Sequence, residues 1–306
     1  MNQSWAHEIF VDEGLATRLI REQFDFHITS LTDLGHGWDN AAFLVNEEYV
    51  FRFPRRQVAV DLLLREADVL PHIAPKLPLA IPHPLFFGKP SLDYPWPFQG
   101  YKHIPGLSGC FLNLSRNQRS SISADLACFL KDLHSLDVKS EWKHVLPIGD
   151  KRARGSFQEC FARVNERLEI IIKAGAISSQ EKFQSLLKLA QQITQPNDLE
   201  SLVHGDLYAR HLLLNDTKLA GIIDWGDMHI GDPAIDLAIA YGFLPRESHK
   251  LFLKNYGPIG EEMWHRAKLW ALYSATAICW YGHDANVKDL KREGQMALEF
   301  IKEETT

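Results

Sequence analysis

The first third of the chain alternates apolar and polar residues with the period of a β-strand. From 43 to 53, two short apolar and aromatic runs flank a polar turn, which is typical of a β-hairpin. The period of two places Tyr49, Phe51 and Phe53 on one face of the second strand. Arg52 therefore faces the other way, on the side opposite three aromatic rings.

A helical period of apolar residues follows the hairpin. It runs from about 58 to 73, and two prolines shortly beyond it end the predicted helix. Further along, Ser115 and Gln118 match a capping box, and an apolar stripe behind them extends to residue 136, which predicts another helix. Additional helices are predicted over 156–174, over 179–193 and, several in number, after Pro233. Asp232 is expected to cap the first helix after Pro233.

One β-like segment, from 202 to 224, interrupts this helical region. The order of elements therefore predicts an α+β protein with two lobes. A small N-terminal lobe over 1–103 contains an antiparallel sheet, and a large, mainly helical C-terminal lobe covers 104–306. Residues 99–106 are the candidate linker. A length of 306 residues exceeds the usual size of one hydrophobic core, which favours the same division.

Composition narrows the class of protein. Hydrophobic residues make up 45% of the chain and charged residues 24%, which is ordinary for a folded globular protein. The formal net charge of −6 argues against a general nucleic-acid binder, because phosphate contacts require clustered Lys and Arg. The four cysteines are far apart and form no CxxC pair, so neither a zinc site nor a disulfide framework is expected.

The sequence shows no targeting or membrane signal. Its amino terminus lacks the basic and apolar regions of a secretory signal. The longest apolar stretch, 269–281, contains Ser274 and Thr276 and is shorter than the roughly 20 residues that a membrane helix needs. We therefore expect a buried helix at this stretch, and a cytoplasmic, monomeric protein without a membrane or nucleic-acid partner.

Two aspartates at the ends of short apolar runs carry the candidate chemistry. Asp206 ends the sequence His-Gly-Asp, and Asp224 begins the sequence Asp-Trp-Gly. Phosphoryl transfer needs a carboxylate at the acceptor hydroxyl, ligands for a metal ion and cations on the phosphates. A strand pair between the two aspartates would bring both carboxylates to one edge. Either aspartate alone would also suit a turn, but the pair favours chemistry.

Several motifs together carry a resemblance to a known family. The chain resembles the aminoglycoside and macrolide phosphotransferase family, which has a protein-kinase-like fold, from about residue 28 to 245. The motifs in the C-terminal half are HGDLYARH at 204–211, GIIDWGD at 221–227 and GDPAIDLA at 231–238. Those in the N-terminal half are GHGWDNAAFLV at 35–45, YVFRFPRR at 49–56, LREADVL at 64–70 and FQGYKHIPG at 98–106.

The resemblance assigns roles in the C-terminal lobe by position. Asp206 would be the catalytic base for the acceptor hydroxyl, and Asp224 would bind Mg²⁺. His211 stands where the family often has an asparagine as second metal ligand, although some members also carry histidine there. A histidine beside three leucines suits a structural role equally well. Asp227 is a candidate acceptor-site residue, and His204 is expected to anchor the loop backbone.

The resemblance also assigns a nucleotide site in the N-terminal lobe. Arg52 stands where kinases place a phosphate-binding lysine, and Glu66 would be its acidic partner. Without the resemblance, an exposed ion pair of little consequence would be the preferred interpretation. Backbone groups of Gly37 would approach the phosphates. The residues assigned to nucleotide binding in the linker are Tyr101, Lys102, His103 and Ile104.

These roles imply a kinase that transfers the γ-phosphoryl group of ATP or GTP, with Mg²⁺, to a hydroxyl of an aminoglycoside or macrolide. Such a reaction would give antibiotic resistance. One alternative keeps the fold and phosphorylates a metabolite alcohol, such as choline, homoserine or a sugar. Another is a non-catalytic nucleotide-binding protein, which is motivated by Arg52 and His211 at positions where stricter kinases carry Lys and Asn. The sequence leaves the acceptor and the choice of nucleotide open.

Overall fold

Two units make up the part of the chain that is described by the computed structural model. The described residues are 7–304 apart from 38, 139, 150–156, 194–195 and 197–198. The N-terminal unit comprises Met1–Lys76 and Ala80–Ile104, and the C-terminal unit comprises Leu77–Leu79 and Pro105–Thr306.

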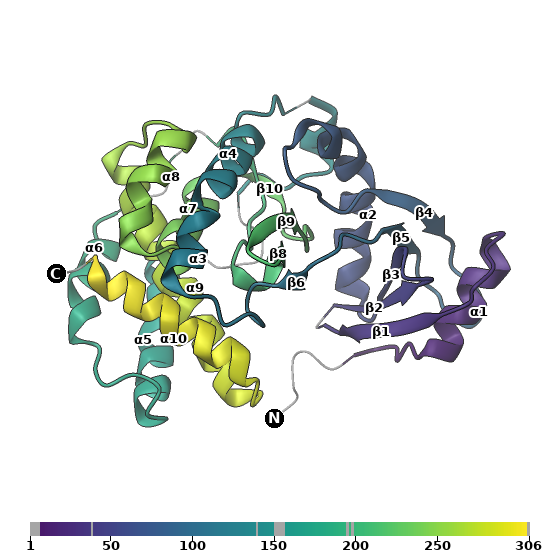
Figure 1. The fold of residues 1–306 in the computed structure, drawn as a ribbon, viewed down its shortest axis with the longest axis horizontal. Coiled ribbons are helices and arrows are strands. Elements are labelled where there is room, and N and C mark those ends of the chain that lie inside the picture. The colour runs from purple at the N-terminus through teal and green to yellow at the C-terminus, as the bar shows by residue number, and fades with distance from the viewer. Residues whose placement is uncertain are drawn as a thin grey trace. The chain divides into compact units, whose positions relative to one another are not determined.

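A five-stranded antiparallel sheet forms the centre of the N-terminal unit (Figure 1), with the strand order β1-β2-β3-β5-β4. The strands are β1 (Leu31–His36), β2 (Asn40–Val45), β3 (Tyr49–Pro54), β4 (Pro84–Gly88) and β5 (Phe98–Lys102). The predicted hairpin is confirmed as β2 and β3, in which Phe43 lies opposite Phe51.

The helices α1 (Glu13–Gln23) and α2 (Gln57–Ile73) pack against this sheet. Phe51 and Phe53 pack into an apolar core together with Leu19 and Ile20 of helix α1. Helix α2 confirms the helix predicted from 58 to 73 and contacts β3, β4 and β5. Arg52 forms an ion pair with a residue of α2, so the period-two assignment of strand faces is confirmed.

Helices dominate the described part of the C-terminal unit. They include α3 (Arg116–Ser121), α4 (Ser123–His134), α5 (Phe157–Lys173), α6 (Gln184–Ala190), α7 (Ala234–Gly242), α8 (His249–Tyr256), α9 (Glu261–Asp284) and α10 (Lys288–Glu303). The apolar stretch from 269 to 281 lies in α9 and is largely buried, as expected. Among the described helices, none has the length and apolar character required to cross a membrane.

The structure corrects two of the predicted helices. The helix predicted from the confirmed capping box of Ser115 and Gln118 to residue 136 is two helices, with the capping box on α3 and the apolar stripe on α4, because the backbone at Ile122 turns to φ −93° and ψ 0°. This break allows Arg119 of α3 to point towards α10 while the stripe of α4 packs elsewhere. The helix predicted over 179–193 is shorter, with the 3₁₀ turn Glu181–Phe183 leading into α6.

Short strands hold the loops between these helices. Strand β7 (Ser201–Val203) pairs with β10 (His229–Gly231), and β8 (Leu212–Asn215) pairs with both β6 (Leu107–Ser108) and β9 (Lys218–Ile222). The predicted β-like segment is therefore confirmed, although its strands belong to two separate small sheets.

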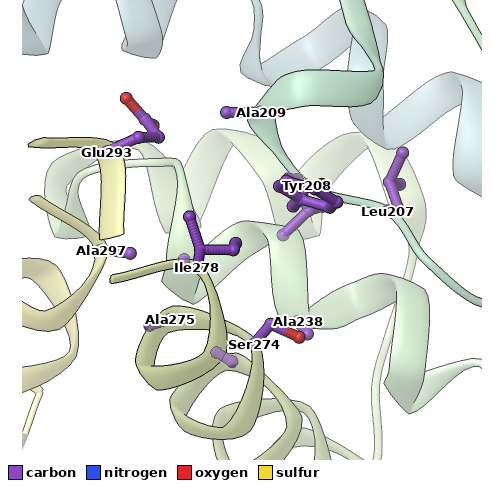
Figure 2. A pocket seen from close by; sticks show the side chains of 12 residues that line it. Leu207, Tyr208, Ala209, Ala238, Ser274, Ala275, Ile278, Glu293 and Ala297 are labelled. Carbon is purple, nitrogen blue, oxygen red and sulfur yellow. The ribbon is translucent and has the colours of Figure 1, made fainter. Parts of the chain in front are cut away.

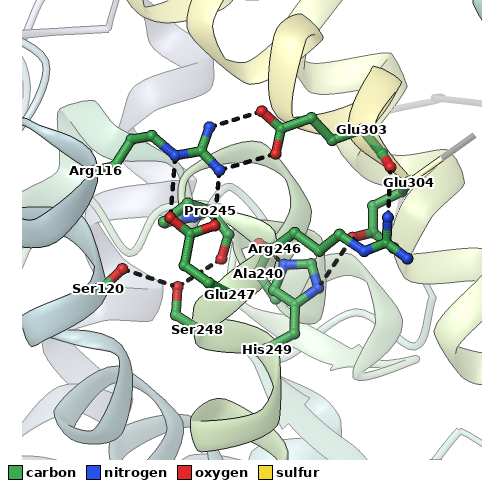
Figure 3. Close-up of polar contacts among 10 residues, drawn as sticks. All are labelled: Arg116, Ser120, Ala240, Pro245, Arg246, Glu247, Ser248, His249, Glu303 and Glu304. Atoms are coloured by element: carbon green, nitrogen blue, oxygen red, sulfur yellow. Dashed lines mark hydrogen bonds and ion pairs between the residues drawn. The ribbon is translucent and has the colours of Figure 1, made fainter. Parts of the chain in front are cut away.

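Two neighbouring arginines of α3 form ion pairs of very different burial. Arg119 makes a bidentate pair with Glu293 of α10 at 2.6 and 2.7 Å, and both side chains are only 3% exposed. Arg116 pairs with Glu247 and Glu303 (Figure 3), but its side chain is 43% exposed. The buried pair joins α3 to α10 inside the unit, whereas the exposed network joins the same helices in contact with water.

Replacement of Arg119 by methionine should lower the free energy of unfolding by about 3–5 kcal/mol, because Glu293 would remain as a buried carboxylate without its partner. Arg116→Met is the matched control and should cost about 1 kcal/mol or less, since its ion pairs are exposed. Urea denaturation of both variants measures the difference. Equal losses of stability would show that burial does not distinguish the two ion pairs.

Candidate active site

The two candidate aspartates lie at the same end of one strand pair, Asp206 before it and Asp224 after it in the sequence. Asp206 belongs to the loop between β7 and the 3₁₀ turn Ala209–His211, and Asp224 follows β9. The turn leads directly into β8, which pairs with β9, and the Ile223 N–H donates to the His211 carbonyl at 3.0 Å. Residues 204–211 form the loop that would be the catalytic loop by resemblance. The strand pair therefore brings this catalytic loop beside Asp224.

The side chain of His211 lies between the two carboxylates. Its Nδ1 is 4.0 Å from Asp206 Oδ2, and its Nε2 is 3.3 Å from Asp224 Oδ2. The ring is buried, with 5% of the side chain exposed, whereas Asp206 is 37% and Asp224 52% exposed. Both carboxylates are therefore accessible to solvent, whereas the imidazole ring that lies between them is buried.

Hydrogen bonding defines the protonation of His211. Nδ1 lies 2.7 Å from the Asp206 carbonyl, which only accepts, so Nδ1 carries a proton. Burial lowers the pKa of His211, but the hydrogen bond to Asp224 and the charges of both aspartates outweigh it, so the pKa is raised overall. The same contacts favour the charged form of the two neighbouring carboxylates whenever the ring is protonated.

His204 anchors the catalytic loop and is neutral. Its Nε2 donates to the carbonyl of Ile223 at 3.0 Å, and its Nδ1 accepts from the Asp206 N–H at 3.3 Å. Both bonds require the same neutral tautomer. Burial lowers the pKa of His204, which agrees with this tautomer. The expected anchoring role is therefore seen in the structure, and the ring serves the loop backbone rather than a reacting group.

A buried carboxylate on α7 fixes the backbone just before Asp206. Asp236 is fully buried and accepts hydrogen bonds from the backbone N–H groups of His204 at 2.7 Å and Gly205 at 2.9 Å. His134 Nε2 lies 3.1 Å from the same carboxylate. Burial raises the pKa of Asp236, but these donors outweigh burial and lower the pKa overall. Sequence analysis missed this residue, although it lies in the quoted motif GDPAIDLA.

Asp232 contributes at the same helix start. Its Oδ1 accepts from the Ala234 N–H at 3.1 Å, and its Oδ2 pairs with Arg266 Nε of α9 at 2.5 Å. The N-cap of α7 is Pro233, so the prediction of Asp232 as the cap is wrong by one residue; Asp232 lies just before the cap and also pairs with another helix.

Gly205 occupies a position that only glycine suits. Its φ is +84°, in the left-handed region, and a Cβ there would lie 2.4 Å from the carbonyl oxygen of Asp227. That carbonyl also accepts from His229 Nδ1 at 2.8 Å. The backbone of the candidate acceptor-site residue Asp227 thus packs directly on the catalytic loop.

In the N-terminal unit, Glu66 receives two hydrogen bonds on one oxygen. Arg52 Nη1 donates to Glu66 Oε2 at 2.7 Å, and Gln99 Nε2 donates to the same oxygen at 2.8 Å. The exposed fractions are 11% for the Arg52 side chain and 1% for that of Glu66, so the interpretation as an exposed ion pair is wrong. Sequence analysis missed Gln99, which is fully buried on β5 opposite Arg52.

The other candidate nucleotide residues lie in two places of this unit. Tyr101 and Lys102 end β5, His103 donates its N–H to the Glu48 carbonyl at 2.7 Å, and Ile104 ends the unit. Gly37 lies between β1 and β2 and donates its N–H to the Asn40 carbonyl at 2.9 Å. The Gly37 amide is thus engaged within its own loop.

The donor set of the C-terminal site fits a magnesium ion that is held jointly with phosphate. Mg²⁺ prefers oxygen ligands and is usually bound by one or two carboxylates together with substrate phosphates. Asp224 supplies an accessible carboxylate of this kind. Over the described ranges, no group of three or more His, Cys, Asp or Glu side chains is arranged to hold a metal by itself. His211, the other residue assigned to the metal, contacts the Asp206 carbonyl through Nδ1 and the Asp224 carboxylate through Nε2.

A small cavity lies behind the catalytic loop (Figure 2). Leu207 and Tyr208 of the loop line it together with apolar residues of α9 such as Ile278. Its volume is about 20 Å³, close to that of one water molecule. The carboxylate of Glu293 in its wall is already paired with Arg119. A cavity of this volume has room for about one water molecule and is too small for an acceptor of the size of an antibiotic.

An accessible carboxylate on a loop that a buried aspartate fixes, with a second accessible carboxylate beside it, is the arrangement expected of a kinase-like phosphotransferase. Residues 30–270 match the Phosphotransferase enzyme family, APH, and the chain belongs to this family.

Known proteins with similar sequences and structures support the same class. Viomycin phosphotransferase from Streptomyces vinaceus is 28% identical over 203 residues, which are 64% of this chain and 67% of that protein. The structure of the GDP and kanamycin complex of APH(2″)-IIIa has 25% identity and a TM-score of 0.67, with 94% of this chain and 98% of that chain covered. Macrolide 2′-phosphotransferase MphH from Brachybacterium faecium has the same fold, with 20% identity, a TM-score of 0.61 and coverage of 93% and 97%.

Gly205→Ala should reduce turnover by about 10²-fold, because the added Cβ would displace the loop that carries Asp206. Gly260→Ala is a suitable control, since Gly260 has φ −62° and no atom lies within 4 Å of its added Cβ. Steady-state kinetics and thermal unfolding of both variants check this expectation. Normal turnover of Gly205→Ala would contradict the tight packing of Gly205 against Asp227.

Proposed function

We propose that this protein transfers the γ-phosphoryl group of a nucleoside triphosphate, with Mg²⁺, to a hydroxyl of an antibiotic. The observation that carries the proposal is the pair of accessible carboxylates, Asp206 and Asp224, on either side of His211. Membership of the phosphotransferase family supports the reaction type. The relatives act on viomycin, or were solved with kanamycin and GDP, and these names supply the antibiotic classes for the test.

Each carboxylate has a separate role in the proposed reaction. Asp206 accepts the proton of the acceptor hydroxyl while the hydroxyl oxygen attacks the γ-phosphorus, and the nucleoside diphosphate leaves. Asp224 holds Mg²⁺, which neutralises charge on the phosphate oxygens when bound. His211 keeps Asp224 oriented through its Nε2, and it holds the Asp206 backbone through its Nδ1.

Arg52 is the proposed phosphate-binding cation of the N-terminal unit. An arginine can donate to two phosphate oxygens at once, and it remains charged even when partly buried. Its pairing with Glu66 and the support of that carboxylate by Gln99 hold the guanidinium in one orientation. Tyr101, Lys102, His103, Ile104 and the loop of Gly37 are the proposed surroundings of the base and phosphates.

The direct test is phosphoryl transfer from ATP and, separately, from GTP to viomycin, to aminoglycosides and to macrolides in the presence of Mg²⁺. Mass spectrometry of each antibiotic detects the added phosphoryl group. Modification of one class identifies both the acceptor and the preferred nucleotide. If no antibiotic is modified while a metabolite alcohol is, the antibiotic assignment is wrong and the alternative of a metabolite kinase is supported.

Asp206→Asn should lower kcat by about 10²–10⁴-fold, because the amide cannot accept the proton of the hydroxyl. The affinity for Mg-nucleotide, measured by titration calorimetry, should change little. Asp216→Asn is the matched control: Asp216 is exposed in the turn of the same strand pair with φ 55°, a conformation that asparagine tolerates. If Asp206→Asn retains native turnover, the assignment of Asp206 as the catalytic base is wrong.

Asp224→Asn tests the metal role separately. Loss of the carboxylate charge should weaken binding of Mg-nucleotide by about tenfold or more, whereas metal-free nucleotide should bind as before. Calorimetry with and without Mg²⁺ distinguishes the two. Equal affinity of native and variant protein for Mg-nucleotide would contradict the assignment of Asp224.

A further inference from the structure

Helix α8 reaches the catalytic loop through a chain of side-chain hydrogen bonds. The hydroxyl of Tyr256, in the last turn of α8, lies 2.9 Å from His134 Nδ1. His134 Nε2 lies 3.1 Å from Asp236 Oδ2, and Asp236 accepts the backbone N–H groups of His204 and Gly205. The loop residues that precede Asp206 are thus connected to three helices, α4, α7 and α8.

The chemistry of the three hydrogen-bonded side chains determines which of their atoms donate. A buried carboxylate only accepts, so His134 must present an N–H at Nε2. In the neutral ring Nδ1 then carries a lone pair, and the Tyr256 O–H is positioned to donate to it. Because the His134 side chain is 5% exposed, water is poorly placed to replace that donor. The hydrogen bond of one ring nitrogen determines the proton on the other.

We propose that Tyr256 is a positioning residue for phosphoryl transfer, which acts through His134 and Asp236 on the backbone of the catalytic loop. The Tyr256 hydroxyl keeps the His134 ring in the orientation and tautomer that donates to Asp236. Asp236 then holds the amides of His204 and Gly205. Tyr256 touches neither nucleotide nor acceptor in this account. The part that concerns turnover rests on the proposed function.

The neighbours of Tyr256 account for its fixed orientation. Its ring stacks on Phe252 one turn earlier in α8, with centroids 6.0 Å apart, and meets the His134 ring at 73°. Helix α8 packs along α4, and among the described residues of α8 it is Tyr256 that hydrogen-bonds to His134. The hydroxyl is therefore the specific connection, and it is removed without loss of the ring in Tyr256→Phe.

The test compares Tyr256→Phe with Tyr241→Phe in the native-length protein. Tyr241 is a buried tyrosine of α7 whose hydroxyl makes no hydrogen bond to another residue in the described part of the chain. Tyr256→Phe should lower kcat about fivefold, the equivalent of one lost hydrogen bond, and leave the KM for nucleotide unchanged. Tyr241→Phe should leave both constants unchanged.

Amide hydrogen exchange provides a measurement that requires no substrate. The amides of His204 and Gly205 should exchange about fivefold faster in Tyr256→Phe than in the native protein, whereas amides within α8 itself should be unaffected. In a double-mutant cycle with His134→Asn, the kinetic effect of Tyr256→Phe should disappear, because its only route to the loop has been removed.

These outcomes separate the positioning role from simple stabilisation. A fall of kcat that accompanies a general loss of thermal stability, with uniform exchange across the unit, would overturn the proposal. So would unchanged exchange at His204 and Gly205. If the native protein phosphorylates no acceptor, the proposed function fails, and the exchange measurement alone still decides whether Tyr256 holds the loop.

Discussion

The geometry of the site depends on the hydrogen bonds that the buried carboxylate of Asp236 accepts. A fully buried anion is costly unless several donors surround it, and Asp236 receives two backbone N–H groups and an imidazole N–H. Both backbone donors lie immediately before Asp206. Because α7 packs against α9 and α10, the carboxylate joins the loop to the helical core, and the loop cannot shift without leaving a buried charge unpaired.

Two histidines extend this restraint from opposite sides. His204 joins the catalytic loop to the strand pair through Ile223, and His211 joins the Asp206 backbone to the Asp224 carboxylate. Their pKa values shift in opposite directions, because burial dominates at His204 and the neighbouring carboxylates dominate at His211. One imidazole therefore hydrogen-bonds to backbone groups, whereas the other also contacts a carboxylate. The exposed carboxylates, to which we assign metal and acceptor in the proposed function, are held by buried groups.

The sequence pattern predicted the secondary structure that depends on residues close together in the chain. The hairpin, helix α2 and the capping box at Ser115 follow from periodicity and turn chemistry, and the quoted motifs led to the family. The pattern could not reveal the partners of Asp236, or the buried hydrogen bond of Gln99 to Glu66, because these residues are distant in sequence. The apolar stripe likewise gave no sign of the break at Ile122, which separates Arg119 from α4. Helix α1 was not predicted, although Asp12 caps it and its buried residues Ala16, Leu19 and Ile20 recur at helical spacing.

The most direct measurement of the central claim is antibiotic resistance in a susceptible bacterium that expresses either the native protein or Asp206→Asn at equal levels. The account predicts that the native protein raises the inhibitory concentration of the antibiotic that it phosphorylates in vitro, and that Asp206→Asn gives no protection. Equal protection by both proteins would contradict phosphoryl transfer at Asp206 as the basis of the function.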